Sequence, residues 1–556
     1  MIQPDLSVVV TAHDEGILLH KTVRSLQRAL TQLDGEFTYE VILHLDSPSP
    51  ETIDYVQRYR PTVLRNYTII QNSFHDPSLS RNMAVAHSNA RWVAVIDGDD
   101  LVTRNYFICA LSLLSTSSQY LVVHPQFVVS FGTIKNIMQQ YSSSGRAADT
   151  LRMVYGNLWS VACVAPREVF LEHPYQPNTS AFGYEDKLFN CDTLADEISH
   201  VVVQTALFYR RKSKSVLTEH GDLCSVIRPS PYFDYDVLKT PPLVDQIQSL
   251  IRDQGDHPRS HSDQSSCSGL FHRVAGLCSR LVIEHHRANI RASKTYERWY
   301  IALKHRIRMK LPLYHNKPQA THGQAQYPHW LISEMYEVHL LDAQVYPDND
   351  LIYNLPPFTY NYRLDPGRAF IQITNGTKQR PDTMFLVGYA SQGEANKVLT
   401  NCANELSRRK EGHICVMQTQ VDTQGACTEG LDSEISFVDF ARVSADLPSY
   451  EEKLAVLAHF LVQHRIERII IWNSQLGYDF VARYRSLIRE SKISVDILTS
   501  ETLSDNRQMG YCQEQLPAIY DVVHKIITDN HAVVQELVDE FGFDPDRFVT
   551  RPRFGS

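Results

Sequence analysis

Two carboxylates separated by a single glycine carry the clearest chemical signal in this sequence. The apolar stretch WVAVI runs directly into Asp97-Gly98-Asp99-Asp100. An Asp-x-Asp pair at a strand end places both carboxylates on one side of a turn, where their hard oxygens suit Mg²⁺ or Mn²⁺ and, through the metal, a diphosphate. An ordinary Asp/Gly turn explains the same four residues, so both interpretations stay open on the tetrapeptide alone.

Three residues nearer the N-terminus could serve the same site. Asp14 follows the apolar run LSVVVTA, and Asp46 ends the run EVILHLD, so both acids could reach a base and a ribose. Arg81 lies just ahead of WVAVI and is a cation suited to phosphate. With Asp97, these residues make a candidate nucleotide-sugar site.

A second acid pair, Glu185-Asp186, stands at the start of an amphipathic stretch. Acids at a helix start are favoured by the helix dipole alone. The functional alternative is that Asp186 is a general base that removes a proton from an attacking hydroxyl. Glu185 is then a candidate contact to the acceptor or the diphosphate.

The segment LFYRRKSKS offers polar and basic side chains for a pyrophosphate leaving group. These are Tyr209, Arg210, Arg211 and Lys212, of which we select Tyr209 and Arg210 as candidate diphosphate or acceptor contacts. His220 could be a third metal ligand, although a lone histidine is more often a surface or packed residue.

Alternating apolar and amphipathic stretches must position these side chains. Strands are expected at LSVVVTA, EVILHLD, TIIQN and RWVAVIDGDD, with helices at LLHKTVRSLQRALTQL, SPSPETIDYVQRY and SLSRNMAVAHS. Such alternation predicts an α/β fold with a mainly parallel sheet and right-handed crossovers. Ligands bind beyond the carboxyl ends of strands in these sheets, where the acids are expected.

The middle of the chain has a different character. Residues 240–268 are polar and rich in Ser, Asp and His, which predicts a linker or mobile loop. Residues 270–312 have a long helical pattern with ten basic residues against two acidic ones. A solvated helix face explains this charge, and so does contact with anionic lipid head groups or an anionic glycan carrier.

A second strand–helix alternation begins near Thr383. Strands are expected at TMFLVGY, HICVMQT, ISFVDF, RIIIWNS, VDILTS and HKIITDN, with helices at ANKVLTNCANELSRR, EEKLAVLAHFLVQHR and HAVVQELVDEFG. This pattern predicts another Rossmann-like unit. The expected domains are therefore 1–240, 241–382 and 383–556.

Composition excludes several classes of protein. The 556 residues are 43% apolar and 21% charged, as in a soluble globular protein, and the net charge of −9 argues against nucleic acid as a partner. No secretory leader and no stretch of about 18 uninterrupted apolar residues is visible. The ten cysteines form no CxxC pair, which favours reduced thiols. We therefore expect a cytoplasmic protein, with peripheral contact at the inner face of the cell membrane through 270–312 as an option.

The first 230 residues resemble family 2 glycosyltransferases of the GT-A fold. The resemblance rests on VVVTAHDEG, the strand end at Asp46, DPSLSRNMAVAHSNARWVAVIDGDD, FGYEDKLF and FYRR. It implies inverting transfer from a nucleotide-diphosphate sugar, and we expect a UDP-sugar as the donor. It also implies nucleotide contacts at Asp14 and Asp46, a Mn²⁺ or Mg²⁺ at Asp99 with Asp97 nearby, and Asp186 as the base. The usual family opening ends in Asn-Glu, where this chain has His13-Asp14-Glu15.

The C-terminal block resembles a different class. FLVGYASQGEANKVL, RIIIWNSQLGYDFVARY and IITDNHAVVQELVDEFGFDPDRFVTRP look like the N-terminal, acceptor-side half of a family 4, GT-B glycosyltransferase. Because such enzymes bind the donor mainly in their second half, residues 383–556 are not expected to complete a reaction alone. Gly393 and Glu394 are expected in the loop that faces the cleft. The resemblance suggests part of a longer protein or a natural remnant.

The leading hypothesis is a metal-dependent inverting glycosyltransferase of the hexosyltransferase class. Its acceptor would be a hydroxyl of a growing bacterial surface polysaccharide of the O-antigen or capsule type, free or lipid-linked. The alternative is a catalytically inactive nucleotide-binding or scaffolding module of a larger glycan-assembly protein. A pyrophosphorylase is disfavoured because no Gly-rich phosphate loop with Lys or Arg lies near the N-terminus.

Overall fold

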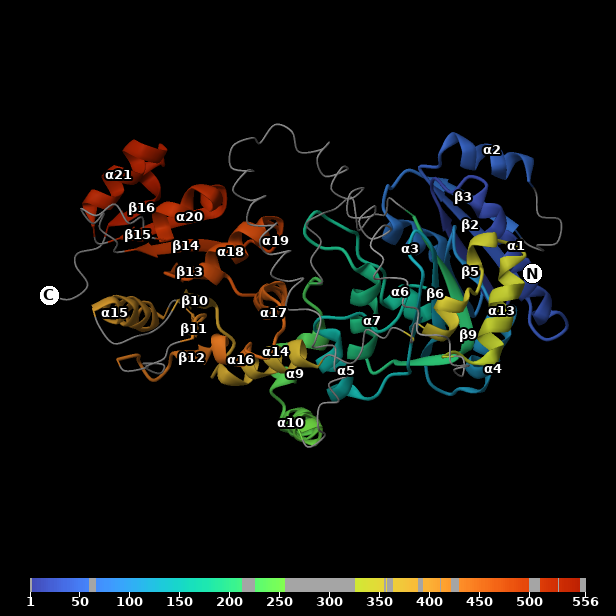
Figure 1. Cartoon of the computed structure of the whole chain (residues 1–556), viewed down its shortest axis with the longest axis horizontal. Helices are drawn as coiled ribbons and strands as arrows, with labels where there is room; N and C mark the ends of the chain where they lie inside the picture. Colours follow the sequence, from blue (N-terminus) through green and yellow to red (C-terminus); the bar gives the residue numbers. More distant parts are fainter. Residues whose placement is uncertain are drawn as a thin grey trace, which may run out of the picture. The chain divides into compact units, whose positions relative to one another are not determined.

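The chain divides into two compact units, Met1–Leu250 with Gln326–Ser556 and Ile251–Ala325. The computed structural model (Figure 1) describes residues 3–59, 67–212, 226–255, 326–354, 357, 364–388, 394–410, 412–421, 430–499, 511–528 and 530–550. The predicted basic segment 270–312 lies outside these residues. None of the helices in these ranges is long and apolar enough to cross a membrane.

The first sheet contains nine strands in the described part of the chain, in the order β3-β2-β1-β4-β8-β6-β9-β5, with β7 paired to β6. The strands β3, β2, β1 and β4 are mutually parallel, which confirms the predicted alternation. Strand β8 is antiparallel to both β4 and β6, so the whole sheet is mixed. The bounds are β1 (Leu6–Ala12), β2 (Tyr39–Asp46), β3 (Tyr67–Asn72), β4 (Trp92–Asp97), β5 (Leu101–Val102), β6 (Leu121–Gly132), β7 (Asn136–Gln139), β8 (Cys163–Pro166) and β9 (Ser199–Arg211).

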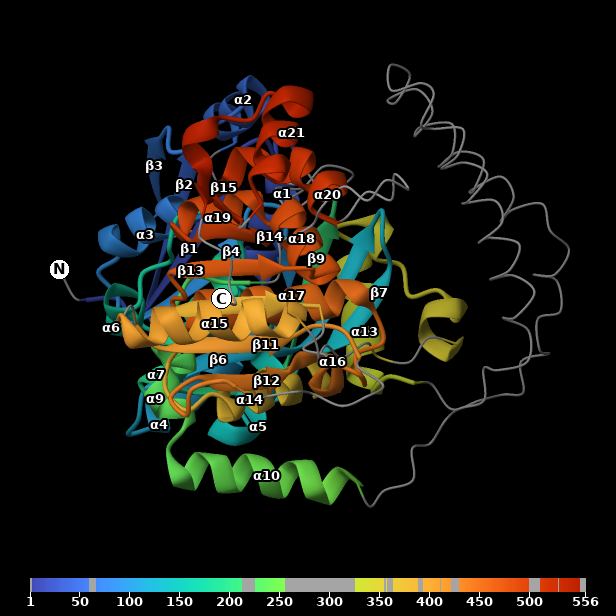
Figure 2. The same ribbon diagram turned by 90° about the vertical axis from the view of Figure 1, so that its left-hand side faces the viewer.

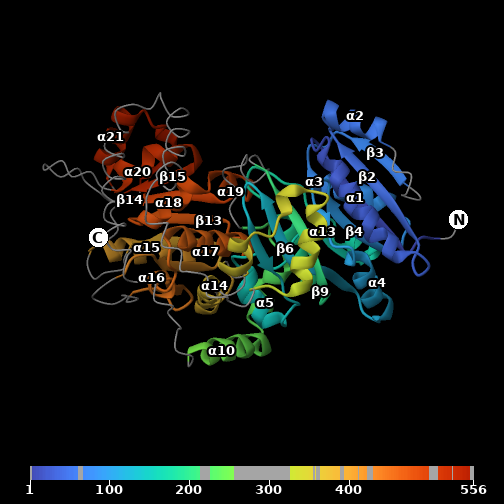
Figure 3. The same ribbon diagram turned by 45° about the vertical axis from the view of Figure 1, so that its right-hand side comes forward.

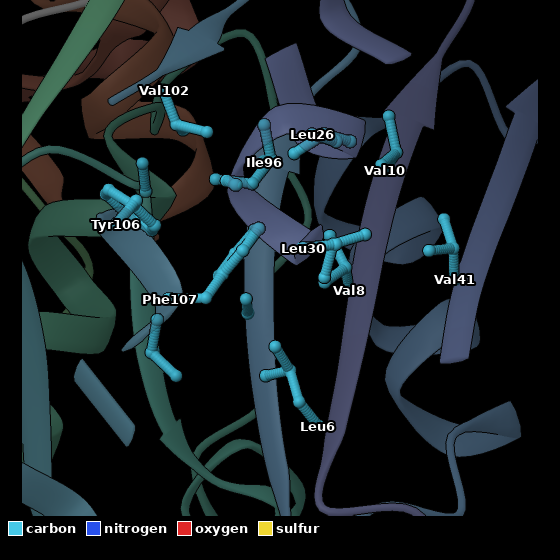
Figure 4. Packing of buried hydrophobic residues seen from close by; sticks show 14 of the residues in the cluster. Leu6, Val8, Val10, Leu26, Leu30, Val41, Ile96, Val102, Tyr106 and Phe107 are labelled. Atoms are coloured by element: carbon cyan, nitrogen blue, oxygen red, sulfur yellow. The ribbon is translucent and has the colours of Figure 1, made fainter. Parts of the chain in front are cut away.

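Helices cover both faces of this sheet, which explains why its strands are apolar on both sides. Leu6, Val8 and Val10 of β1 pack with α1 and α4 in one cluster, as Figure 4 shows in part. Val9 points to the other face and packs with α3, α6 and α7. The bounds are α1 (Leu18–Leu30), α2 (Pro50–Arg58), α3 (Pro77–His87), α4 (Tyr106–Thr116), α5 (Arg146–Met153), α6 (Arg167–Glu172) and α7 (Glu185–Ala195).

The second sheet is parallel throughout and has the order β12-β11-β10-β13-β14-β15-β16. Strand order reverses direction at β10, as in doubly wound folds. This confirms a Rossmann-like parallel sheet, while its likeness to half of a GT-B enzyme stays a prediction. Figure 2 shows α15 in front of the sheet. The bounds are β10 (Thr383–Val387), β11 (Ile414–Gln418), β12 (Ser436–Asp439), β13 (Arg468–Trp472), β14 (Ser494–Thr499), β15 (Val523–Thr528), β16 (Phe548–Thr550), α15 (Glu394–Arg408), α17 (Tyr450–Gln463), α18 (Gln475–Arg483), α19 (Arg485–Glu490), α20 (Tyr511–Ile519) and α21 (His531–Phe541).

The described parts of the predicted linker are ordered. Residues 241–255 were expected to be a linker but form the helix α10 (Pro241–Gly255), because Leu243 and Ile247, four residues apart, are buried on one face. Farther on, α13 (His329–His339) lies along β6 and β9 (Figure 3) and packs Leu331 and Met335 into the cluster that contains Phe127. Helix α14 (Asp365–Gly376) packs against α17. Residues 326–354 thus complete the hydrophobic core of the first sheet.

Candidate active site

The turn after β4 lies directly against the end of β1. The backbone N–H of Gly98 donates to the carbonyl oxygen of Thr11 at 2.8 Å. A Cβ at this position would lie 2.8 Å from that same oxygen and 2.9 Å from the Cβ of Ala12, so only glycine fits. This contact places Asp97 and Asp99 at the carboxyl edge shared by β1 and β4, where the sequence predicts a site.

A buried guanidinium joins this edge to the second acid pair. The side chain of Arg81, on α3, is 4% exposed. Its Nη2 lies 2.9 Å from Oδ1 of Asp97, and its Nη1 lies 2.8 Å from Oε1 of Glu185. The guanidinium also lies over the ring of Tyr175, 5.5 Å from the ring centre. The structure therefore brings together acids that are far apart in the sequence.

Asp186 lies in the first turn of α7, in a setting that favours its neutral form. The helix follows Tyr184, whose φ of 58° is in the left-handed region that costs a non-glycine residue about 1 kcal/mol. Oδ2 of Asp186 accepts a hydrogen bond from Nδ2 of Asn157 at 2.8 Å, and Oδ1 accepts one from the Lys187 N–H at 2.8 Å. Burial and the charge of Glu185 raise the pKa of Asp186 to about 7, against the opposing effect of the Lys187 hydrogen bond.

An ammonium group lies among the acids at the other side of the turn. Nζ of Lys212 is 3.0 Å from Oδ2 of Asp99, 3.1 Å from Oε1 of Glu15 and 3.7 Å from Oδ1 of Asp14. Burial raises the pKa of Asp99 to about 6, opposed by Lys212 and reinforced by the charges of Glu15 and Asp97. The side chain of Asp14 is 65% exposed, so it lies at the rim of this group.

The carboxylate of Asp46 accepts hydrogen bonds from neighbouring groups of its own chain. Its two oxygens accept hydrogen bonds from three backbone N–H groups and two hydroxyls, those of Phe74, His75, Asp76, Ser47 and Ser80. Burial raises the pKa of Asp46, but these hydrogen bonds outweigh burial and leave it below its usual value. The geometry assigns Asp46 to ordering the loop before α3, and its direct nucleotide contact stays a prediction.

The side chains of Tyr209 and Arg210 lie in different environments. Nη2 of Arg210 lies 2.5 Å from Oδ2 of Asp342, which also accepts from Nζ of Lys21 at 2.8 Å. The ring of Tyr209 packs against the core cluster of β1, with the guanidinium of Arg211 4.8 Å from the ring centre. The Arg210 side chain, which we predict to contact the diphosphate, is therefore already paired with Asp342.

Residues 7–195 match the family model described as Glycosyl transferase family 2. This part of the chain is similar to family 2 glycosyltransferases. No curated protein matches it in sequence.

Solved structures that match the chain include two of low sequence identity. TarS 1-349 from S. aureus, in complex with UDP-GlcNAc, is 14% identical, with a TM-score of 0.31, 42% of this chain and 64% of that chain covered. Mannosyltransferase PcManGT from Pyrobaculum calidifontis, in complex with GDP-Man and Mn²⁺, is 12% identical, with a TM-score of 0.32, 45% of this chain and 70% of that chain covered. The chain thus spans less than two thirds of the length of this TarS chain.

The structure also places near this site residues that we did not select as site residues from the sequence. Glu15 and Lys212 lie next to Asp14 and close to Arg210 in the sequence, and this proximity could have identified them as site residues. Asn157 and Asp342 had no local signal, because their partners lie 29 and 132 residues away in the sequence. Two predicted positions, His220 and Gly393, and the side chain of Glu394 lie outside the described residues.

The carboxylates of the family 2 domain have the donor chemistry that Mn²⁺ and Mg²⁺ prefer. Asp97 and Asp99 supply hard oxygens at one edge, although Arg81 and Lys212 each pair with one of these oxygens. Among the described residues, no group of three or more His, Cys, Asp or Glu side chains is arranged to hold a metal. The described side chains therefore fit part of a metal's coordination shell.

Proposed function

We propose that this chain transfers a sugar, with inversion, from a nucleoside-diphosphate sugar to an acceptor hydroxyl. The observation that carries the proposal is the buried bridge from Asp97 through Arg81 to Glu185, with distances of 2.9 and 2.8 Å. It joins Asp97 at the end of β4, which suits the donor side, to Glu185, whose neighbour Asp186 suits the acceptor side. Inverting displacement requires a base and charge stabilisation on opposite faces of the anomeric carbon.

In this proposal Asp186 is the catalytic base. The acceptor oxygen forms a bond to the anomeric carbon, the bond from that carbon to the diphosphate oxygen breaks, and the hydroxyl proton goes to Asp186. A pKa of about 7 suits this task, because the carboxylate is partly ionised near neutral pH and still basic enough to accept a proton. The Asn157 hydrogen bond at 2.8 Å holds one carboxylate oxygen in place.

On the donor side, Asp97 and Asp99 would hold Mn²⁺ or Mg²⁺. When bound, such an ion stabilises the negative charge that develops on the leaving diphosphate. Arg81 keeps Asp97 in a fixed orientation, because its guanidinium is buried and planar.

The finer identity of the substrates rests on the sequence resemblance. We propose a UDP-sugar as the donor and a growing bacterial surface polysaccharide of the O-antigen or capsule type as the acceptor. We also propose a cytoplasmic location, with the basic segment 270–312 contacting anionic lipid or an anionic glycan carrier. Co-sedimentation with liposomes, with and without anionic lipid, tests this contact.

A donor screen tests the main proposal. The purified chain is incubated with a panel of nucleoside-diphosphate sugars and Mn²⁺, and released nucleoside diphosphate is measured. We expect release with at least one donor, and its loss in Asp99→Ala and Asp186→Ala. Asp34→Ala, an exposed acid at the end of a 3₁₀ turn, is the matched control and should retain activity. Nucleotide binding without hydrolysis or transfer for any donor would support the inactive binding module instead.

A further inference from the structure

Lys212 takes the place of a bound cation within the proposed donor site. It directly follows the last residue of β9, and its side chain is 31% exposed. Its ammonium faces carboxylates from two separate turns, Asp99 after β4 and Asp14 and Glu15 after β1. The side chains of Asp99 and Glu15 are only 14% and 9% exposed, so these two ion pairs are largely shielded from water.

The ammonium of Lys212 forms ion pairs with all three carboxylates of this acidic group. An ammonium has three N–H donors, and three carboxylates lie between 3.0 and 3.7 Å from Nζ of Lys212. Without this ammonium, the ionised carboxylates of Asp99 and Glu15 would repel each other in a largely buried site. Lys212 is thus the counter-charge that allows these acids to gather before any substrate is bound.

The same position conflicts with a divalent cation. A Mn²⁺ or Mg²⁺ ion bound to Oδ2 of Asp99 would lie about 2.1 Å from that oxygen. Because Nζ of Lys212 is 3.0 Å from the same atom, the two cations would be no more than about 5 Å apart, where their like charges repel each other. The metal and the ammonium therefore compete for this oxygen.

We propose that Lys212 is a resident cation that competes with the metal and yields to it when the donor binds. This inference rests on the proposed function. The diphosphate of the donor offers Lys212 another anionic partner, and the flexible four-carbon stem of lysine allows its ammonium to move there. Lys212 thereby makes metal and donor binding mutually dependent, and it is a positioning residue for the donor.

Metal binding to the full chain without nucleotide tests the proposal. Free Mn²⁺ is titrated by electron paramagnetic resonance in the wild type, Lys212→Met, Lys212→Gln and Lys212→Arg. We expect Mn²⁺ to bind about tenfold more tightly to the two neutral variants, because a competing positive charge is gone. Lys212→Arg should bind like the wild type. Lys135→Met, which removes an exposed lysine paired with Asp348 at 3.2 Å, is the matched control.

The location of the added Mn²⁺ is tested in a double variant. Combining Lys212→Met with Asp99→Asn should cancel the gain in affinity. An unchanged or weaker Mn²⁺ affinity in both neutral variants, no detectable Mn²⁺ binding by either, or a gain that survives Asp99→Asn would each overturn the proposal. Because this readout needs no transfer, it stands apart from the donor screen: sugar transfer without the Mn²⁺ effect refutes only the role of Lys212.

Discussion

Replacing Asp186 with asparagine should stop sugar transfer and at the same time stabilise the folded chain. Asparagine has the shape of aspartate but cannot ionise, so it cannot accept the acceptor proton. The ionised carboxylate is also costly to the fold, since burial and Glu185 raise the pKa of Asp186 from 3.8 to about 7. A residue retained for catalysis at the expense of stability behaves in this way.

The size of the stabilisation follows from the pKa. One pKa unit corresponds to about 1.4 kcal/mol, so a shift of about three units sets a ceiling of about 4 kcal/mol. Solvent screening of the half-buried side chain lowers this value. Asparagine also loses the hydrogen bond from the Lys187 N–H or turns an amide donor toward it, at a cost of about 1 kcal/mol. The net gain should be about 1–2 kcal/mol, or about 2 °C or more in unfolding temperature.

The pH dependence separates this account from a general packing effect. The folded-state pKa of Asp186 lies above its ordinary value, so its destabilising effect is absent below about pH 3.8, grows between 3.8 and 7, and is complete above 7. The Asp186→Asn variant should therefore gain more unfolding temperature at pH 8 than at pH 5, by differential scanning calorimetry. Asp34→Asn, the exposed control, should show no such difference. A variant that unfolds at a lower temperature at pH 8, or an equal gain at both pH values, would refute the reasoning.

Three further predictions concern the described core. Asp342→Asn should lower the free energy of unfolding by about 3 kcal/mol in urea titrations, because both cationic partners lose a buried carboxylate; an unchanged midpoint would contradict this. Leu331→Ala should cost about 3 kcal/mol in the same assay if 326–354 completes the first core, and a loss below 1 kcal/mol would count against it. The wild type should lose stability as pH falls from 6.5 toward 3, because burial lowers the pKa values of His124 and His200, and His200→Gln should flatten that decline in pH-dependent unfolding curves.

Several elements of the fold are determined locally and were predictable from sequence. The strands β1, β2 and β4 of the first sheet and most strands of the second are short, apolar and rich in β-branched residues, and polar corners or helix caps bound them. Asp76, for example, caps α3 by accepting from the N–H groups of Ser78 and Leu79. The placement of Asp97 and Asp99 at a strand end was predictable for the same reason, since only the preceding apolar run and one glycine are needed.

The pairing of charged side chains was decided only by tertiary structure. Arg81 was predicted as a phosphate contact, and in the fold it pairs with Asp97 and with Glu185, 104 residues farther along the chain. Arg210 was predicted on the same grounds and pairs with Asp342, across 132 residues. No spacing rule reports such partners, because residues of any separation can meet once the strands are ordered in a sheet.

The sequence by itself determined which chemistry this protein carries, namely acids at strand ends, an acid pair at a helix start and a basic strand end after them. Hydrophobic periodicity and turn chemistry act over a few residues, so these features are legible in the linear chain. Tertiary structure alone decided that Lys212 lies among Asp14, Glu15 and Asp99, and that Asp186 is held by Asn157 in a place that raises its pKa. Burial and charge act through space, and they are set by elements that meet only in the folded chain.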